Sequence, residues 1–303
     1  MHKGQLDVSG ATARWLIDEQ FPQFRDLPLR PLASAATVNS IFRLGEGLTV
    51  RFPLIGEDAD ETRTILRAEM TACAEFAALS PVPAPHPIAI GEPGHDYPLP
   101  WSIQTWVQGQ DAVEEDPAGS EDFADDLANL LLVLREADTR GRRFGGTGRG
   151  GHLPDHDEWL GICFRKSEGL LDVSRLRRVW AFMRPLPEVD DDVMAHGDLT
   201  PPNVLLDRSG LAGVLDTGGF AAADPALDLV SVWHLLDERG RSRVRDRLAS
   251  SEAQWMRGMA WAFQQAVGLV WYYADTNPSM SQWGRRTLER LLAAPELQEC
   301  DRG

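Results

Sequence analysis

The sequence is poor in cysteine and has no long apolar run. Its three cysteines, Cys73, Cys163 and Cys300, lie far apart in 303 residues. An odd and scattered set of this kind argues against a disulfide framework or a cysteine metal cluster, and it is typical of a reducing cytoplasm. No segment stays apolar for the ~18 residues that a membrane span needs, and the first residues lack the apolar core of a signal peptide. We therefore expect a soluble, cytoplasmic protein.

Basic residues are outnumbered by acidic ones. The formal net charge is −16 at pH 7 and the sequence pI is near 4.8. Nucleic acid and anionic membrane surfaces are therefore poor partners, because both carry negative charge. The acidic balance favours solubility or, as a sharper alternative, the attraction of a cationic substrate. With 43% hydrophobic residues, the chain can bury a sizeable core in one or two domains.

Apolar residues at helical spacing predict helices over much of the chain. The expected helices cover residues 9–24, 61–79, 123–137, 159–173, 174–183 and most of 243–292. A further helix is expected to open at Asp224 and to run through Trp233 to Asp237. Most aromatic residues near the C-terminal end should lie in the core: Trp255, Trp261, Trp271, Tyr272 and Tyr273.

The most informative stretch runs from Met194 to Phe220. It contains His196-Gly197-Asp198, then Asn203 five positions after that Asp and Asp216 thirteen positions after the Asn. Two short apolar runs, split by a turn at 207–210, predict a β-hairpin between these polar residues. Carboxylate and amide oxygens brought to the ends of a hairpin suit a divalent metal ion and a hydroxyl nucleophile.

This stretch resembles the catalytic and metal-binding loops of kinases, and its His-Gly-Asp form is similar to the aminoglycoside phosphotransferase family. The resemblance covers nearly the whole chain and is strongest from Met194 to Leu229. It implies an α+β, bilobal, protein-kinase-like fold. A small N-terminal lobe, residues 1–106, would bind nucleotide through an antiparallel sheet plus a helix. A larger, mainly helical lobe, residues 107–303, would carry catalysis and substrate binding.

The resemblance assigns roles to five residues at or near this stretch. Asp198 would accept or orient the proton of a substrate hydroxyl, while Asn203 and Asp216 would hold Mg²⁺ against the phosphate oxygens of ATP or GTP. His196 and Asp228 would support the catalytic loop, the latter through hydrogen bonds to its backbone. Phosphoryl transfer asks the protein mainly for positioning and charge stabilisation. The expected reaction therefore moves the γ-phosphate to a hydroxyl of a small molecule.

A competing motif lies inside the same stretch. Residues 214–218, V-L-D-T-G, match the signature of aspartic proteases, in which two such Asp residues share a proton. A single-chain protease needs a second copy of the motif, which the sequence lacks, and a dimeric one would be shorter and mostly strand. We therefore reject the protease interpretation. Thr217 remains unusual, because kinases place an aromatic residue at that position.

Residues upstream match the small lobe of a kinase. Strand-like runs on either side of Gly45-Glu46-Gly47 predict a hairpin, and a helix follows at 61–79. Arg51, on the second strand, stands where the kinase pattern places a Lys that pairs with phosphate. Glu69 on the helix is the candidate partner that would hold Arg51 extended. Both residues are expected at the nucleotide.

The turn before this hairpin departs from the kinase pattern. Kinases cover the phosphates with a glycine-rich loop, because only Gly lets backbone N–H groups approach closely, but the turn from Ser34 to Asn39 has no glycine. These two end residues are left as candidates for phosphate contact. Farther on, residues 101–107 predict a strand that leads to the interlobe connection, where the family binds the purine through backbone groups. Gln104 and Trp106 are the candidates there, and both ATP and GTP stay open.

The resemblance implies an antibiotic as the acceptor, most often an aminoglycoside, with nucleoside, peptide and macrolide antibiotics left open. Glu168 and Asp275 are candidate contacts for ammonium groups of such a substrate. The glycine- and arginine-rich residues 139–151 are expected to form a loop at the substrate side, rather than a phosphate cradle or an RNA-binding arm. A metabolic kinase with a choline- or homoserine-like acceptor, or a non-catalytic nucleotide-binding regulator, are the alternatives. Either a monomer or a homodimer is expected.

Overall fold

The chain forms two compact units in the computed structural model, which describes residues 6–32, 39–56, 58–113, 115–145, 149–188 and 191–298. The first, here the small unit, comprises Met1–Ala78, Pro83–Gln108 and Asp216–Gly219. The second, here the large unit, comprises Leu79–Val82, Gly109–Leu215 and Phe220–Gly303. The predicted division into lobes 1–106 and 107–303 stays a prediction.

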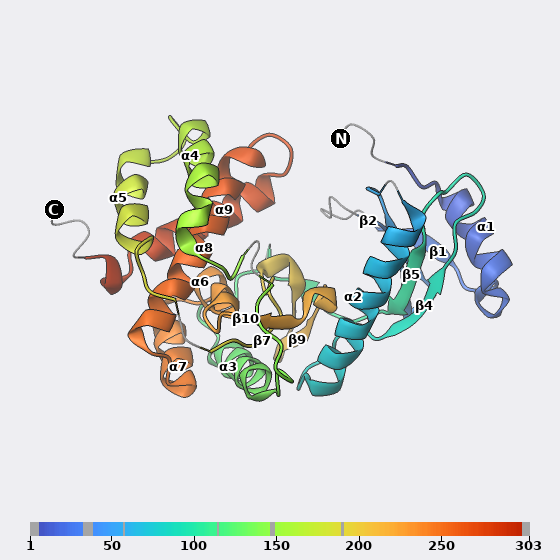
Figure 1. The fold of residues 1–303 in the computed structure, drawn as a ribbon, viewed down its shortest axis with the longest axis horizontal. Coiled ribbons are helices and arrows are strands. Elements are labelled where there is room, and N and C mark those ends of the chain that lie inside the picture. The colour runs from blue at the N-terminus through green and yellow to red at the C-terminus, as the bar shows by residue number, and fades with distance from the viewer. Residues whose placement is uncertain are drawn as a thin grey trace. The chain divides into compact units, whose positions relative to one another are not determined.

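An antiparallel sheet forms the centre of the small unit (Figure 1). Its strand order is β1-β2-β3-β5-β4, with the bounds Leu29–Pro31 for β1, Asn39–Leu44 for β2, Leu48–Pro53 for β3, Pro87–Gly91 for β4 and Trp101–Thr105 for β5. The predicted hairpin is confirmed, since β2 and β3 pair with Leu44 opposite Leu48. Gly45 makes this turn with a φ of +61°, a conformation that favours glycine.

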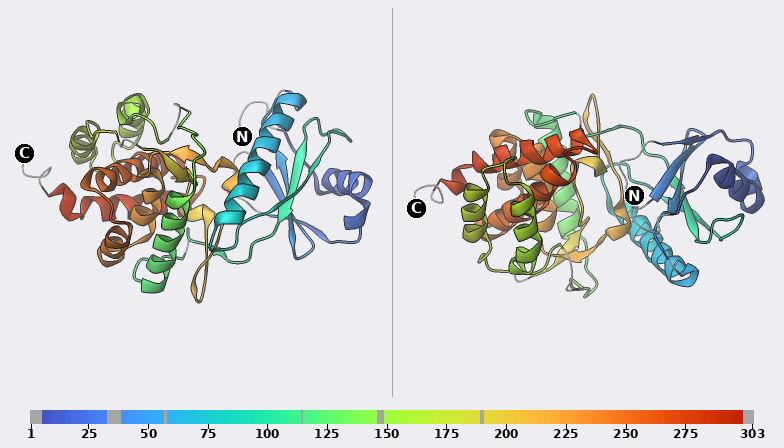
Figure 2. Two further views of the ribbon diagram at one scale, coloured as in Figure 1. Left: turned by 60° about the horizontal axis from the view of Figure 1, so that its bottom comes forward. Right: turned by 90° about the horizontal axis from the view of Figure 1, so that it is seen from above.

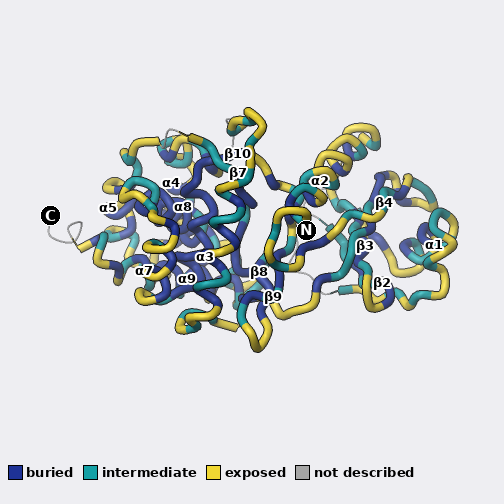
Figure 3. The backbone as a smooth tube through the Cα atoms, turned by 90° about the horizontal axis from the view of Figure 1, so that it is seen from below, coloured by how far each residue is buried: buried dark blue, intermediate teal, exposed yellow. Residues whose placement is uncertain are grey.

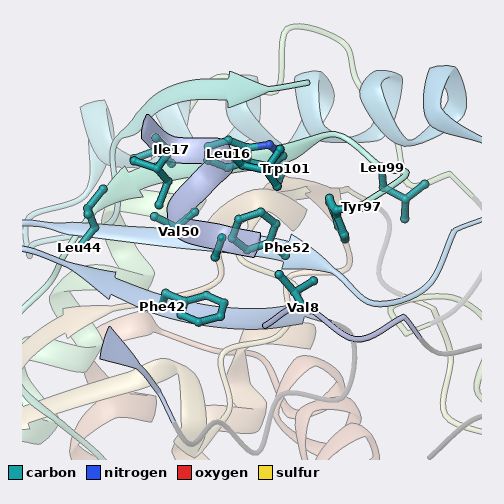
Figure 4. Close-up of a cluster of buried hydrophobic side chains, with 12 residues drawn as sticks. Val8, Leu16, Ile17, Phe42, Leu44, Val50, Phe52, Tyr97, Leu99 and Trp101 are labelled. Carbon is teal, nitrogen blue, oxygen red and sulfur yellow. The ribbon is translucent and has the colours of Figure 1, made fainter. Parts of the chain in front are cut away.

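A buried apolar cluster packs one side of this sheet against α1, Gly10–Gln20 (Figure 4). The helix begins as predicted, because the hydroxyl of Ser9 accepts a hydrogen bond from the Thr12 amide at 3.0 Å. Within the cluster the rings of Phe52 and Trp101 stack with centroids 5.0 Å apart. The helical conformation ends at Gln20, just before Pro22, because Phe21 leaves it and Pro22–Phe24 form a 3₁₀ turn.

The second helix of the small unit, α2, spans Ala59–Leu79 and confirms the helix predicted there. Figures 1 and 2 show α1 and α2 on either side of the sheet. Side chains alternate along a strand, so Arg51 of β3 lies on the face opposite to Val50 and Phe52, which are in the α1 cluster. This alternation directs the predicted phosphate-binding residue towards α2.

The large unit holds the predicted central hairpin. Strands β8, Val204–Asp207, and β9, Gly210–Val214, pair antiparallel, and β6, Gln110–Asp111, extends them to the order β6-β8-β9. A separate pair joins β7, Val193–Ala195, to β10, Ala221–Ala223. The loop from His196 to Asn203 therefore leaves one sheet and enters another.

Helices make up most of the large unit, and α8 is buried along most of its length (Figure 3). Ser251 and Gln254 form a capping box at its start. The helix bounds are Glu121–Glu136 for α3, Asp157–Lys166 for α4, Val173–Met183 for α5, Val230–Leu235 for α6, Glu238–Leu248 for α7, Glu252–Tyr272 for α8 and Pro278–Leu292 for α9. Short 3₁₀ turns occur at Leu153–His156, Pro201–Asn203, Thr217–Gly219, Leu227–Leu229 and Pro295–Leu297.

Two predicted helices of this unit are wrong in extent. The helix expected over 159–173 ends at Lys166, because the chain turns through Gly169 with a φ of +80°. The helix expected from Asp224 begins only at Val230, after a 3₁₀ turn at Leu227–Leu229. The early segment is held instead by the Asp224 carboxylate, which accepts a hydrogen bond from the Ala226 amide at 2.8 Å.

The aromatic residues predicted for the core differ in burial. Trp255 and Trp261 are fully buried, whereas Tyr272 is 46% exposed at the end of α8. Trp271 and Tyr273 are half-buried. Among the helices that the structure describes, none has the length and apolar character that a transmembrane helix requires.

His234 of α6 is a buried titratable group in the core of the large unit. Its Nδ1 accepts a hydrogen bond from the indole of Trp283 at 3.1 Å and lies 2.8 Å from Thr287 Oγ1, and its Nε2 lies 2.9 Å from the Gln265 side-chain oxygen. This network fits a neutral imidazole that carries its proton on Nε2. Burial lowers the pKa of His234 to about 4, helped by the charges of Arg290 and Arg149 and opposed by the Gln265 hydrogen bond.

Stability of the large unit should therefore depend on His234 in mildly acidic solution. An unfolded histidine has a pKa near 6.5, so between about 6.5 and about 4 the unfolded chain binds more protons than the folded chain. The free energy of unfolding should then fall as pH falls through this window, by roughly 3 kcal/mol at most. Urea unfolding of wild type and His234→Gln, in steps between pH 7.5 and pH 4, measures this dependence. The free energy of unfolding of the variant should change less with pH.

His86, an exposed histidine of the small unit, provides the matched control. His86→Gln should leave the pH dependence of unfolding unchanged. An equal slope in wild type and His234→Gln would show that other groups carry the acid sensitivity.

Candidate functional site

The loop that begins at His196 is fixed by a buried carboxylate. Asp228 accepts hydrogen bonds from the backbone amides of His196 at 2.7 Å and Gly197 at 2.9 Å. The His196 imidazole continues the network, since its Nδ1 accepts from the Asp198 amide at 3.2 Å and its Nε2 donates to the Leu215 carbonyl at 2.8 Å. Each of these contacts orders the backbone around Asp198. The geometry supports the loop-bracing roles predicted for His196 and Asp228.

Asp228 is 5% exposed, and a nearby arginine, Arg135, favours its charged form. Burial raises the pKa of Asp228, while the electrostatic interaction with His196, the two amide hydrogen bonds and the charge of Arg135 act in the opposite direction. Arg135 of α3 donates to the Pro225 carbonyl at 2.7 Å. Burial lowers the pKa of this arginine, and the charges of Asp228 and Asp224 raise it. The buried carboxylate of Asp228 and the partly buried guanidinium of Arg135 thus favour one another's charged forms.

Asn203 closes the loop from its far end. Its side-chain amide donates to the Asp198 carbonyl at 2.9 Å, with a longer contact of 3.4 Å to the Asp198 carboxylate. The Asn203 carbonyl accepts from the Leu215 amide at 2.8 Å. Because the amide nitrogen faces Asp198, the side-chain oxygen of Asn203 is the atom left to bind a cation.

The carboxylate of Asp198 forms an ion pair with Arg149, which sequence reasoning missed. Both side chains are partly exposed, at 38% for Asp198 and 39% for Arg149. Residues 139–151 were expected only as a loop at the substrate side, and their glycines carry no periodicity that would place an arginine. Of these residues, 146–148 lie outside the described part of the chain.

A second ion pair, which is buried, was also missed. Arg257 of α8, 1% exposed, binds the Asp224 carboxylate through Nε at 2.6 Å and also donates to the carbonyls of Pro187 and Gly151, each at 3.2 Å. A signal for it exists in the sequence, because one arginine interrupts the apolar run W-M-R-G-M-A-W. A lone charge on a buried helix must be paired. The pair ties α8 to the loop that carries Arg149.

In the small unit, Arg51 pairs with Asp216 rather than with Glu69. The guanidinium donates from Nη2 to Asp216 Oδ1 at 2.8 Å. No ion pair or hydrogen bond joins Arg51 to Glu69 within the described residues, and the partnership of these two residues at a nucleotide stays a prediction. Two residues predicted to bind partners of opposite charge, phosphate and Mg²⁺, lie against each other.

Glu69 nevertheless acts on Arg51 through its charge. Burial lowers the pKa of Arg51, but the charge and hydrogen bond of Asp216, with the charge of Glu69, outweigh burial and raise it overall. Partial burial raises the pKa of Glu69, which the charge of Arg51 lowers and that of Asp216 raises further. Arg51 is therefore a permanent cation between two acids.

The residues around Asp216 explain an unusual feature of the sequence. Asp216 has a φ of +57°, a left-handed conformation that costs a non-glycine residue roughly 1 kcal/mol. Thr217, which stands where kinases place an aromatic residue, is fully buried. At Gly218 an added Cβ would meet the Glu69 side chain at 3.1 Å. Small residues after Asp216 therefore let α2 approach this segment closely.

The other predicted site residues are dispersed. Asn39 begins β2, and Gln104 lies on β5 opposite Thr49. Trp106 donates its backbone amide to the Gly47 carbonyl at 2.8 Å, and the guanidinium of Arg43 lies over its indole at 4.5 Å. That amide is thus engaged within the small unit. Ser34 lies outside the described residues.

The candidate acceptor contacts, Glu168 and Asp275, are both exposed in the large unit. Glu168 lies in the turn after α4, bridged to Leu171. Asp275 lies in the turn between α8 and α9. Neither forms an ion pair among the described residues, and their proposed role stays a prediction.

The donors predicted for Mg²⁺ are chemically suitable. Asn203 presents an amide oxygen and Asp216 a half-exposed carboxylate, both hard oxygen ligands. Within the described residues, no group of three or more His, Cys, Asp or Glu side chains could hold a metal ion. Mg²⁺ needs no such cage, because it is usually bound by one or two carboxylates together with substrate phosphates and water.

The contribution of Asp228 can be tested by its isosteric amide. In Asp228→Asn the side-chain NH₂ would face one of two backbone amides, so a buried donor would lose its acceptor. The free energy of unfolding should fall by roughly 1–3 kcal/mol, as measured by urea unfolding. The amides of His196 and Gly197 should also exchange faster with deuterium.

Asp172→Asn is the matched control for this substitution. Asp172 accepts the Arg175 amide at 3.0 Å as the N-cap of α5, a position that Asn fills equally well. Asp228→Asn unfolding at the same urea concentration as this control would contradict the bracing role.

Comparison with known proteins identifies the family and the fold of the chain. The model of the phosphotransferase enzyme family, APH, matches residues 29–262. The chain is also 29% identical to an aminoglycoside 3′-phosphotransferase of Escherichia coli over 151 residues, which are 46% of this chain and 53% of that protein. This chain thus spans about half the length of that curated relative.

Solved structures share the fold over nearly the whole chain. The GDP and kanamycin complex of APH(2″)-IIIa superimposes with a TM-score of 0.66 at 19% identity, covering 93% of this chain and 98% of that one. Macrolide 2′-phosphotransferase type I superimposes with a TM-score of 0.59 at 15% identity, covering 93% and 98%. The predicted α+β, kinase-like fold is confirmed. Because the family model matches most of its length, the chain belongs to the phosphotransferase enzyme family.

Proposed function

We propose that this protein transfers the γ-phosphate of ATP or GTP to a hydroxyl group of a small molecule. The observation that supports it most is the bracing of Asp198. Its loop is held by Asp228 and His196 at one end and by Asn203 at the other. Its carboxylate keeps 38% exposure. A fixed, accessible carboxylate in a chain of the phosphotransferase enzyme family suits the binding and deprotonation of a hydroxyl.

The other residues have roles that follow from their chemistry. Asn203 and Asp216 are proposed to bind Mg²⁺, which would neutralise the phosphate oxygens when bound. Arg51 is proposed to pair with a phosphate group, because it is a permanent cation whose fork matches phosphate oxygens. His196 would hold the loop rather than move a proton, since both of its ring nitrogens are engaged with the backbone.

An antibiotic is the proposed acceptor. The curated relative is an aminoglycoside 3′-phosphotransferase, and the similar structures include a kanamycin complex and a macrolide phosphotransferase. The net charge of −16 supports a cationic acceptor, since an acidic protein attracts one at low ionic strength. Glu168 and Asp275 are the proposed contacts for its ammonium groups. Action in the cytoplasm, where ATP and GTP are available, is part of the same proposal.

A nucleotide-consumption screen tests this function. The purified chain is given ATP or GTP with Mg²⁺ and, in turn, aminoglycosides such as kanamycin, macrolides, nucleoside and peptide antibiotics, choline and homoserine. At least one antibiotic should raise nucleoside diphosphate release above the rate with water. Asp198→Asn should lower that acceptor-dependent kcat by about 10²–10⁴-fold, the range for loss of a general base.

Asp246→Asn, an exposed acid of α7, is the control for surface charge and should retain wild-type activity. Full activity in Asp198→Asn would refute the assignment of the carboxylate. A response to choline or homoserine alone would identify a metabolic kinase. Mg²⁺-dependent nucleotide binding without any transfer would identify a regulator.

A further inference from the structure

Arg149 is the cation that contacts Asp198 in the described part of the chain. Its Nη1 donates to Asp198 Oδ1, while its Nε and Nη2 have no hydrogen-bond partner among the described residues. The side chain is 39% exposed. Asp198 therefore engages one edge of a guanidinium whose remaining donors are available to a ligand.

The backbone next to Arg149 is held in place. Gly150 has a φ of +96°, and an added Cβ there would meet the Leu227 side chain at 3.1 Å. The Gly151 carbonyl accepts a hydrogen bond from Arg257 at 3.2 Å, and Arg257 is itself fixed by its buried pair with Asp224. A partly exposed guanidinium on an anchored backbone has a defined reach, unlike one on a loose surface loop.

Phosphoryl transfer at Asp198 creates an electrostatic conflict that a guanidinium can relieve. A hydroxyl that is bound by Asp198 and attacks the γ-phosphorus brings two anions, the carboxylate and the phosphoryl oxygens, close together. Charge on the equatorial oxygens has to be stabilised in the transition state. A guanidinium presents five donors in a plane and can bridge two oxyanions at once, whereas an ammonium acts as a point charge.

We propose that Arg149 is a further catalytic residue, which stays paired with Asp198 through one nitrogen and binds oxygens of the transferred phosphoryl group through the others. This inference rests on the proposed function. In the step, the acceptor oxygen bonds to the γ-phosphorus as the bond from that phosphorus to the β–γ bridging oxygen breaks. The electron pair leaves with the nucleoside diphosphate, and the acceptor proton passes to the Asp198 carboxylate. Arg149 keeps its own protons throughout.

The test compares wild type with Arg149→Ala and Arg149→Lys in the presence of Mg²⁺. Hydrolysis of ATP and GTP, with water as the acceptor, is measured alongside transfer to the best acceptor of the screen. Arg149→Ala should lower kcat about 10²-fold in both reactions, the loss seen when one transition-state donor is removed, with the nucleotide KM unchanged. The kcat of Arg149→Lys should lie between those of wild type and Arg149→Ala. Added guanidinium ion should restore part of the activity of Arg149→Ala.

Arg143→Ala is the matched control. Arg143 lies in the same loop, is 67% exposed and pairs only loosely with Asp191 at 3.7 Å, so its loss should change neither reaction. A thermal unfolding midpoint for each variant detects damage to the fold, and a lowered midpoint with no rescue by guanidinium would overturn the catalytic role.

Four further outcomes would also overturn it. A higher kcat in Arg149→Ala would make the ion pair an inhibitory contact on Asp198, and a raised acceptor KM at unchanged kcat would assign Arg149 to acceptor binding. Equal activity in wild type and Arg149→Ala would refute this inference alone. A wild-type chain without turnover on any acceptor or on water would refute the proposed function together with it.

Discussion

The site depends on one interaction: the Asp228 carboxylate accepts hydrogen bonds from two backbone amides. The loop from His196 has no ladder of its own, because it lies between β7 and β8, which belong to different sheets. Its buried N–H groups need acceptors, since an unpaired buried amide costs free energy comparable to a lost hydrogen bond. A carboxylate on a neighbouring turn supplies both acceptors at once. The orientation of Asp198 thus follows from a residue thirty positions away that touches none of the reacting groups.

Burying this acid requires a compensating cation, and three other acids discussed above likewise lie beside an arginine. Asp228 lies near Arg135, Asp224 binds Arg257, Asp198 binds Arg149 and Asp216 binds Arg51. The buried pairs tie helices to loops, where removal of one partner would leave an uncompensated charge. The partly exposed pairs involve the residues assigned to chemistry, because a group that meets a ligand has to remain accessible.

How far these arrangements could be predicted depends on whether a residue's neighbours are set by local sequence. His196, Asp198 and Asn203 follow one another in a short stretch, so their spacing predicts that they share a loop, while the supporting role of Asp228 is implied by the family resemblance. Arg51 had two acids within reach of its charge, and only tertiary packing decides which one receives the hydrogen bond. Arg149 is flanked by glycines that carry no periodicity. Its contact with Asp198 depends on the buried pair of Asp224 and Arg257, which connects segments remote in the sequence.

Two departures from the kinase pattern, Arg51 in place of Lys and Thr217 in place of an aromatic residue, have one physical basis. Small residues after Asp216 allow α2 to pack so closely that a Cβ added at Gly218 would meet the Glu69 side chain at 3.1 Å. That approach adds the charge of Glu69 to that of Asp216 around a cation that burial alone would disfavour. A lysine can lose its charge when it is buried, whereas a guanidinium keeps it and reaches a carboxylate with a planar fork. The close packing of α2 against the residues after Asp216 is therefore consistent with an arginine at position 51. The same packing accounts for both Arg51 and Thr217.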